Sequence, residues 1–238
     1  MSGTTPRGIS DERQAAAWVR DMFGQVAPRY DLLNRLLSFN IDQWWRSRTV
    51  KRLRPVLERP NAVVLDLCCG TGDLSIALSR NARARVLGSD FCHPMLTAAR
   101  RKANLPFFEA DALDLPVADA SFDLITVAFG FRNLANYERG LAELRRALKP
   151  GGTLALLEFS QPPNAAFAAA YNLYSTKVLP RIGAAISGAG EAYTYLPESV
   201  RKFPDAPGLA RMLENAGYMS VSYERMSLGI VALHTGRR

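Results

Sequence analysis

Residues 63–73 read Val63-Val64-Leu65-Asp66-Leu67-Cys68-Cys69-Gly70-Thr71-Gly72-Asp73. An apolar, β-branched run leads into an acid and then into a Gly-x-Gly turn, after which apolar residues recur at helical spacing. A strand, a tight glycine turn and a helix in this order are typical of a nucleotide-type cofactor site at the top of a parallel sheet. Gly70 and Gly72 let a ligand come close to the backbone, because they carry no Cβ.

The residues after the turn discriminate between two kinds of cofactor. A dinucleotide fingerprint has a third glycine three positions after the second, and Ser75 stands there instead. Asp73 also places a negative charge where a pyrophosphate would lie on the helix N-terminus. A cofactor with an adenosine, a cationic centre and no phosphate tolerates that acid. These two residues therefore disfavour a nicotinamide cofactor and favour S-adenosylmethionine.

Further apolar segments follow at intervals and predict the rest of a sheet. They are residues 85–90, 106–112, 121–128 and 153–158, with a helix stop and a turn at 148–152. Near-continuous apolar strands that alternate with helices predict an α/β fold, a doubly wound and mostly parallel sheet with helices on both faces. Asp90 lies 18 residues after Gly72, about where a carboxylate accepts both ribose hydroxyls, and Asp111 follows at the position for the adenine amino group.

Five blocks of sequence carry a resemblance to a known family. They are 22–34, 65–73, Phe129-Gly130-Phe131-Arg132-Asn133, 196–204 and 229–234. With them the chain resembles the class I S-adenosylmethionine-dependent methyltransferases, and more narrowly the C-methyltransferases of menaquinone and ubiquinone biosynthesis. The general class has glycine where this chain has Cys68, and the Cys-Cys pair is a mark of the quinone subgroup. The resemblance implies a seven-stranded Rossmann-like sheet, S-adenosylmethionine as cofactor and a polyprenylated quinol as acceptor. Demethylmenaquinol is preferred over ubiquinone and phylloquinone precursors.

The resemblance also implies which residues hold the two substrates. The cofactor residues are Asp66, Gly70, Thr71, Gly72, Asp90, Asp111, Ala112 and Ala128, and the acceptor-side catalytic residues are Arg132, Asn133 and Tyr30. Some relatives have a hydroxyl residue where this chain has Ala128. Arg132 is no free base, because the pKa of a guanidinium lies above about 12. It would stabilise a quinolate oxygen, or hold a water that relays the proton.

Structural roles remain open for three of the acidic and basic residues in these blocks. Arg132 is alternatively an ion-pair partner of Glu158 or Asp123. Asp31 is alternatively the N-cap of the helix that follows it. Asp66 is alternatively a brace that accepts hydrogen bonds from backbone N–H groups of the glycine turn.

Composition sets outer limits on the kind of protein. A chain of 238 residues predicts one domain with a substantial core. No apolar run approaches the roughly 20 residues that span a bilayer, and the first ten residues lack an apolar signal-peptide core, so we expect a cytoplasmic protein. The three cysteines form neither a disulfide framework nor a Cys-x-x-Cys pair. No His, Cys or carboxylate cluster has ligand spacing, so we predict no metal site. The sequence leaves a homodimer open.

The net charge of +8 is concentrated in one short segment. The segment holds Arg46, Arg48, Lys51, Arg52 and Arg54, with no acid among them. It is either a solvated helix face or a surface that meets an anionic membrane, at the inner face of the cell membrane. A nucleic-acid partner is not predicted, because no recognised binding motif accompanies the charge.

The chain divides into five predicted segments. Residues 1–12 form a disordered tail, 13–60 a helical cap, 61–160 the cofactor-binding half, 162–204 a helical insertion and 205–238 a closing helix and hairpin. The expected cap helices are 15–23, 32–37 and 44–57, the last interrupted near Pro55. The insertion is rich in aromatic residues, which are either plain packed core or the wall of a tunnel for a polyprenyl tail.

Overall fold

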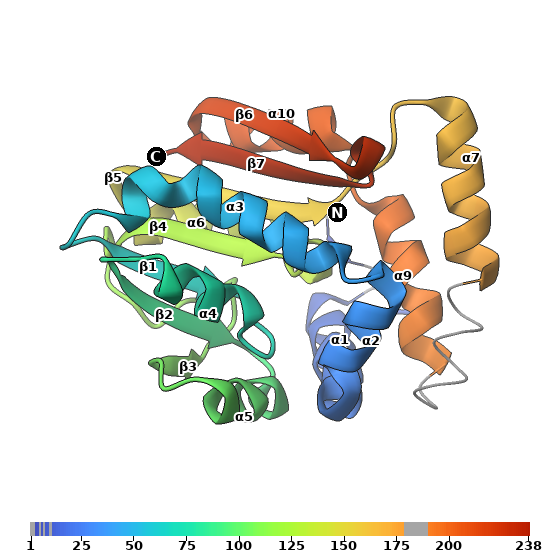
Figure 1. Ribbon diagram of the computed structural model, residues 1–238, viewed down its shortest axis with the longest axis horizontal. Helices are drawn as coiled ribbons and strands as arrows, with labels where there is room; N and C mark the ends of the chain where they lie inside the picture. The colour runs from blue at the N-terminus through green and yellow to red at the C-terminus, as the bar shows by residue number, and fades with distance from the viewer. Residues whose placement is uncertain (1–2, 5, 7, 10, 179–189) are drawn as a thin grey trace.

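One sheet of seven strands lies at the centre of the computed structural model, which describes residues 3–4, 6, 8–9, 11–178 and 190–238 (Figure 1). The strand order is β3-β2-β1-β4-β5-β7-β6; β7 is antiparallel to both of its neighbours, and the other pairs are parallel. The strands are β1 Val63–Leu67, β2 Arg85–Asp90, β3 Phe107–Glu109, β4 Phe122–Ala128, β5 Leu148–Phe159, β6 Met219–Met226 and β7 Val231–Arg237. The predicted doubly wound, mostly parallel sheet is confirmed.

Helices cover both faces of the sheet. α3 (Ile41–Leu57) and α4 (Asp73–Arg80) pack on one face, whereas α6 (Tyr137–Ala147) and α10 (Ala206–Asn215) pack on the other. α5 (His93–Lys102) packs against β2 and β3. This arrangement requires strands that are apolar on both sides, as the sequence indicated.

Strand β1 shows how the two apolar layers are formed. Val64 is fully buried in the cluster that includes Leu53 of α3, whereas Leu65 and Leu67 are buried in the cluster that includes Leu144 of α6. Successive side chains of a strand point to opposite faces, so one apolar strand anchors both layers. The carboxyl end of β1, where the glycine turn begins, is therefore held rigidly between them.

The remaining helices gather at the carboxyl ends of the parallel strands, on the right of Figure 1. The long ones are α1 Glu12–Val26, α2 Tyr30–Ser38, α7 Ala165–Leu173 and α9 Gly190–Lys202. The short ones are η1 Ala27–Arg29, η2 Phe131–Asn133, η3 Tyr174–Val178 and η4 Ser227–Gly229. In open α/β sheets ligands bind at this end of the strands, so these helices form a cap over the expected site.

Two local expectations are wrong. Helix α3 runs through Pro55 to Leu57 without a break; Pro55 cannot donate to the carbonyl four residues before it, and this one lost hydrogen bond falls in the last turn of the helix. Residues 148–152 are not a free turn: α6 does stop at Ala147, but β5 begins at Leu148 and pairs there with Phe122. A register shift in this β4–β5 pairing accommodates the proline and glycines.

The predicted terminal tail makes ordered contacts where the structure describes it. Thr4 is buried, and its backbone N–H donates to the carbonyl of Leu134 at 2.8 Å. Its hydroxyl lies 2.6 Å from the hydroxyl of Tyr195 on α9. Helix α1 begins at Glu12 with Asp11 as its N-cap. The tail thus differs from the expected disorder at these residues, while the division into five segments stays a prediction.

Candidate active site

The glycine turn after β1 is tight because three of its residues have left-handed backbone. Cys68, Gly70 and Gly72 have φ values of 53°, 56° and 82°. Glycine adopts this conformation without strain, whereas at Cys68 the Cβ crowds its own backbone. The Cβ of Cys68 also lies against Gly130, where an added Cβ would be only 2.3 Å away, so glycine is required there. Burial raises the pKa of the Cys68 thiol well above its usual value, which favours packing over a nucleophilic role.

Asp90, at the end of β2, fixes the turn with both carboxylate oxygens. Its Oδ2 accepts from the N–H of Gly70 at 2.8 Å, and its Oδ1 accepts from the N–H of Cys92 at 2.9 Å. Burial raises the pKa of this carboxyl to about 6, although the hydrogen bonds oppose the shift. A carboxylate oxygen has two lone pairs, so each oxygen can accept one further hydrogen bond. This geometry suits a pair of vicinal hydroxyls.

Asp66 is buried below the turn, with 1% of its surface exposed. Its two oxygens accept from the hydroxyl of Ser75 on α4 at 2.6 Å and from the hydroxyl of Thr126 on β4 at 2.8 Å. Burial raises the pKa of Asp66 to about 6. The backbone N–H of Gly70 thus finds its acceptor in Asp90, and Asp66 instead ties β1 to α4 and β4.

Asp31 connects the cap to the glycine turn. It is not an N-cap, because α2 begins at Tyr30 and its cap position is Arg29. Its Oδ1 accepts from the hydroxyl of Thr71 at 2.5 Å. Its Oδ2 lies 2.5 Å from Nζ of Lys102, which also donates to Asp73 at 2.7 Å and to Thr71 at 2.9 Å. We call these four side chains, Asp31, Thr71, Asp73 and Lys102, the cap latch.

The other predicted cofactor residues lie at the ends of neighbouring strands. Asp111 follows β3, is exposed, and accepts from the N–H of Leu113 at 2.9 Å. Ala112 is buried in the core, and Ala128 ends β4 half-buried. Because β3, β2, β1 and β4 are consecutive in the sheet, these residues share one edge with Asp90 and the turn.

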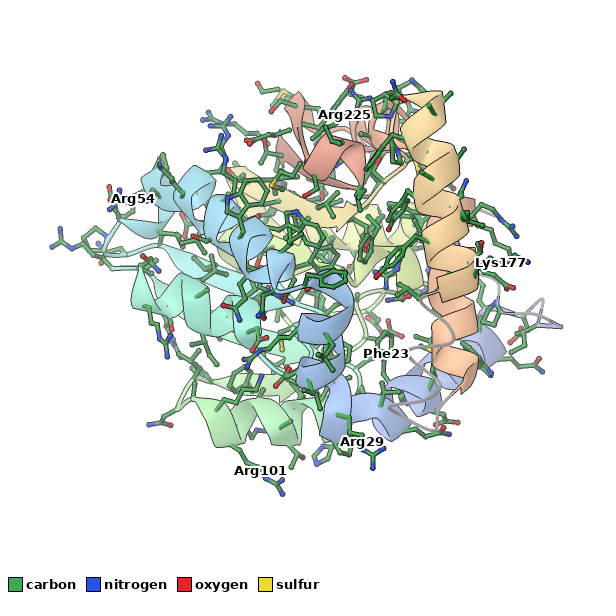
Figure 2. All side chains as sticks on the ribbon, turned by 45° about the vertical axis from the view of Figure 1, so that its right-hand side comes forward. Phe23, Arg29, Arg54, Arg101, Lys177 and Arg225 are labelled. Carbon is green, nitrogen blue, oxygen red and sulfur yellow. The ribbon has the colours of Figure 1, made fainter. Side chains whose placement is uncertain are left out.

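An apolar cavity of about 400 Å³ lies between the cap and the strand ends. Its wall includes Arg132 from the segment after β4. Aromatic residues of the wall are Phe23 (labelled in Figure 2), Tyr30, Phe39, Trp45, Phe129, Phe159, Tyr171, Tyr174 and Tyr195. Asp90 and Asp111 are not among the lining residues. The cavity is therefore placed beyond the turn, where a second substrate would lie.

The predicted insertion contributes part of this wall. The cavity is lined by Tyr171, Tyr174 and Tyr195, whereas Phe203 is packed in the core cluster on the α6 and α10 face of the sheet. The side chain of Tyr193 lies outside the described residues. Phe203 is thus plain packed core, whereas a tunnel for a polyprenyl tail stays a prediction for the residues that line the cavity.

Arg132 forms the ion pair with Glu158 that the sequence offered as an alternative, and it also lines the cavity; its catalytic role stays a prediction. It is 6% exposed, and its Nη1 donates to Oε1 of Glu158 at 2.9 Å and to the carbonyl of Phe129 at 2.5 Å. Asp123 is not its partner, because Asp123 pairs with Lys149 and Arg59. Nε of Arg132 is buried without a protein hydrogen-bond partner in the described structure. The guanidinium lines the cavity, and its pKa is raised by the nearby Glu158 carboxylate against the effect of burial.

Asn133 reaches the cavity through another residue. Its Oδ1 accepts from the hydroxyl of Tyr195 at 3.0 Å, and its own side chain is not part of the wall. Tyr195 is 7% exposed and does line the cavity. Sequence reasoning placed Tyr195 only among the aromatic residues of the insertion and did not single out Lys102, because both residues act across long separations in the chain and no local pattern marks such contacts.

Tyr30 stands between the cavity and the glycine turn. It lines the cavity, and a Cβ added to Gly70 would meet its ring at 3.7 Å. Burial raises the pKa of the Tyr30 hydroxyl, a shift that a hydrogen bond with Asn34 opposes. Its position is where a donor bound at the turn and an acceptor bound in the cavity would meet.

The polar groups at the strand ends fit S-adenosylmethionine better than a metal ion. Buried carboxylates at Asp66 and Asp90, and an open Gly-x-Gly turn, suit a ligand with hydroxyls and a positive centre. No three His, Cys, Asp or Glu side chains gather as metal ligands among the described residues.

The fold and this site together define a class I methyltransferase: a seven-stranded sheet with one antiparallel strand, a glycine turn after β1 and an acid at the end of β2. Solved structures share that fold. One from Thermotoga maritima, described as a "SAM-dependent methyltransferase, possible histamine N-methyltransferase", has a TM-score of 0.66 at 18% identity and covers 91% of this chain and 98% of its own. The [4+2]-cyclase SpnF has a TM-score of 0.69 at 17% identity, with 100% and 99% covered. These likenesses concern the fold alone.

The chain belongs to the ubiE/COQ5 methyltransferase family, whose model matches residues 9–238. It is therefore an enzyme, a methyltransferase, and S-adenosylmethionine is its cofactor.

Curated relatives are similar over nearly the whole chain. The demethylmenaquinone methyltransferase of Thermus thermophilus is 51% identical over 223 residues, 91% of this chain and 100% of the relative. The demethylmenaquinone methyltransferase of Deinococcus radiodurans is 46% identical, with 96% and 95% covered. The ubiquinone/menaquinone biosynthesis C-methyltransferase UbiE of Shewanella pealeana is 40% identical, with 95% and 92% covered.

Proposed function

We propose that this enzyme transfers a methyl group from S-adenosylmethionine to a ring carbon of demethylmenaquinol, the last carbon needed to make menaquinol. The observation that carries the proposal is a buried guanidinium, that of Arg132, set with its Nε unpartnered in the wall of an aromatic cavity beside the cofactor turn. A quinol ring with an isoprenoid tail is mostly apolar and gains negative charge at one oxygen as it reacts. The cavity matches both properties.

The chemistry needs alignment and charge stabilisation more than it needs a covalent intermediate. S-adenosylmethionine supplies the electrophilic methyl group. The protein must hold the acceptor carbon in line with that group, close to contact distance. Tyr30, between the turn and the cavity, would position the quinol ring against the glycine turn.

Arg132 would stabilise the quinolate oxygen that forms when the hydroxyl proton leaves. Its Nε–H has no protein partner and can donate to that oxygen or to a water that takes the proton. Glu158 holds the guanidinium in place from behind, through Nη1 and the backbone N–H of Arg132. Asn133 would act through Tyr195, whose hydroxyl it holds at the cavity wall.

The cofactor assignment follows the edge of the sheet. Asp90 would accept both ribose hydroxyls, and Asp111 with Ala112 would meet the adenine. The turn of Gly70, Thr71 and Gly72 would lie along the methionyl part of the cofactor. Asp66 would lie below this turn, and Ala128 beside it. The free lone pairs of Asp90 and the φ values of the two glycines support this placement.

The acceptor's tail implies work at a membrane surface. No helix in the described chain is both long and apolar enough to cross a bilayer. We therefore infer a cytoplasmic enzyme that contacts the inner face of the cell membrane peripherally and takes the quinol headgroup from there. A homodimer is compatible with this role.

The direct test is methyl transfer in vitro together with the quinone content of a strain that lacks this protein. We expect radiolabelled methyl from S-adenosylmethionine on demethylmenaquinol, and accumulation of demethylmenaquinone in the deletion strain. A normal menaquinone pool in that strain would contradict the proposal. The second candidate acceptor is a ubiquinone precursor, favoured by the similarity to UbiE, and parallel assays with both acceptors separate the two.

A further inference from the structure

Exposed apolar side chains concentrate around the opening of the cavity. Nine large apolar side chains are exposed in the described chain, and seven of them come from three segments that also line the cavity. We call six of these seven the apolar rim: Leu36, Phe39, Ile41, Trp44, Leu173 and Leu228. Phe39 is itself part of the cavity wall and is 74% exposed, so the cavity opens to solvent beside it.

The rim comes from sequence segments that the fold brings together. Leu173, near the end of α7, sits between the wall residues Asn172 and Tyr174. Leu228, in η4, sits between the wall residues Ser227 and Ile230. The other four lie on α2, on α3 or at their junction. Figure 2 turns α7 and the α2–α3 junction toward the viewer.

The two most exposed rim residues occupy positions that favour glycine. Phe39 has φ 52° at the C-cap of α2, and Leu228 has φ 57°, and they are 74% and 72% exposed. Glycine is the usual residue at such a cap, and bulky residues with left-handed backbone are uncommon. Neither the cap nor the core explains these large side chains. Strain of this kind is typical of functional positions.

A basic cavity of about 540 Å³ adjoins this face, and Arg46 lines both cavities. Six of its lining side chains are basic, and its acid, Asp73, is paired with Lys102. Arg35, Lys51 and Arg80 have no carboxylate within 4 Å in the described structure. By contrast, Arg48 and Arg54 of the cluster noted in the sequence pair with Glu224 and Glu58.

We infer that this face is a docking surface for an anionic phospholipid bilayer, in which the apolar rim enters the leaflet and the basic cavity receives lipid phosphates. The inference rests on the proposed function, in which the acceptor is a tailed quinol. A quinol that leaves a bilayer docked on this face meets the opening of the cavity directly. An apolar edge next to unpaired cations matches a bilayer interface in both charge and polarity. A second copy of this chain would bring the same cations against one another, which disfavours it as the occupant.

The test is sedimentation of the purified chain with vesicles of phosphatidylcholine, with and without phosphatidylglycerol, at low and high salt. We expect binding to the anionic vesicles that weakens with salt. Leu228→Gly should lower the partition coefficient at least about fivefold, because it removes apolar surface from the rim. The same variant removes the backbone strain of a leucine with positive φ, so its melting temperature should not fall. Met219→Ser, on β6, is the matched control, since Met219 is 62% exposed and outside the rim.

Charge is tested separately. Lys51→Glu should weaken binding to the anionic vesicles by on the order of tenfold. Arg101→Glu, on α5 and outside the lining of both cavities, should change it little. Brominated lipids should quench tryptophan fluorescence in the wild type, and Trp44→Phe should abolish that quenching while the buried Trp45 remains.

Partition is measured without turnover, so it is independent of the methyl-transfer assay. Failure to methylate any quinol would count against the proposed function alone. The docking surface would be rejected if the protein methylates detergent-borne quinol but binds neither kind of vesicle. It would also be rejected if Leu228→Gly and Met219→Ser weaken vesicle binding to the same extent. A third contradicting outcome is that Leu228→Gly splits a dimer and leaves vesicle binding unchanged.

Discussion

Arg132 both pairs with Glu158 and lines the cavity that we propose for the acceptor, so an alanine substitution would mix two effects. Alanine leaves Glu158 buried without its cation, which destabilises by about 3–5 kcal/mol. Arg132→Lys keeps a positive charge beside Glu158 but loses the planar fork. We expect a folded variant with nearly unchanged cofactor affinity in calorimetry and a turnover lower by about 10²-fold. Arg139→Lys, an exposed pair with Glu12, is the control. Equal losses of stability and cofactor affinity would assign Arg132 to structure alone.

A second prediction concerns Asp90 and the affinity for the cofactor. Asp90→Asn removes the charge and one acceptor while keeping the shape of the side chain. Because charge-assisted hydrogen bonds contribute about 1.5–3 kcal/mol each, calorimetry should show at least about tenfold weaker binding of S-adenosylmethionine. In the wild type, affinity should fall as the pH drops below about 6, where this carboxyl takes up a proton. Glu109→Gln, at the exposed end of β3, should preserve affinity. An affinity unchanged in Asp90→Asn would reject this placement of the ribose.

Asp66 gives a prediction for stability against pH. Its pKa is raised to about 6 in the fold, so between about pH 4 and pH 6 the folded state binds more protons than the unfolded state. The buried charge therefore opposes folding above pH 6 and is absent below pH 4. Asp66→Asn keeps partners for the Ser75 and Thr126 hydroxyls, which can donate or accept. Urea unfolding should show the variant more stable by about 1–3 kcal/mol at pH 7.5 and equal at pH 4. A difference independent of pH would contradict this account.

At the scale of elements, the cap latch joins α2 and α5 to the glycine turn. Lys102 is 27% exposed and bonds to Asp31, Asp73 and Thr71, so its charge acts where the cap meets the cofactor site. Lys102→Met should loosen α2 and speed cofactor release by about fivefold, the scale of one partly exposed ion-pair network. Stopped-flow displacement of the cofactor measures this rate. Arg101→Met on the same helix is the control, and equal release rates would show that the latch has no part in retention.

The elements that the sequence predicted best are those with purely local causes. The strand expected at 85–90 is β2 to the residue, and the strand expected at 121–128 is β4 within one residue, because apolar runs bounded by turns mark buried strands. The glycine turn and Asp90 came from fixed spacing. The roles of Asp31 and Tyr195 could not be predicted from spacing, because they depend on contacts with residues 40 and 62 positions away in the chain. Such contacts follow from how α2 and α9 pack over the sheet, which no short pattern encodes.

At the scale of the whole molecule, the candidate cofactor residues lie at the ends of β3, β2, β1 and β4, and the cavity that we propose for the acceptor lies beyond β4 and β5. In the proposed mechanism Arg132 stabilises the developing charge, because its own positive charge lies buried in an apolar wall where water screens it little. The described chain holds no triad of ligating side chains that would add a metal to this site.

We therefore predict that methyl transfer is independent of divalent cations. Treatment of the purified enzyme with EDTA, followed by gel filtration, should leave the initial rate unchanged, since a cation at the developing oxygen is already supplied by the guanidinium. Added Mg²⁺ or Zn²⁺ should not raise the rate of the treated enzyme. The vesicle-bound and detergent-borne acceptors should be assayed side by side, because divalent ions also screen anionic lipids and could change delivery without touching the chemistry. A rate lost on EDTA treatment and restored by a metal with the detergent-borne acceptor would overturn the role assigned to Arg132.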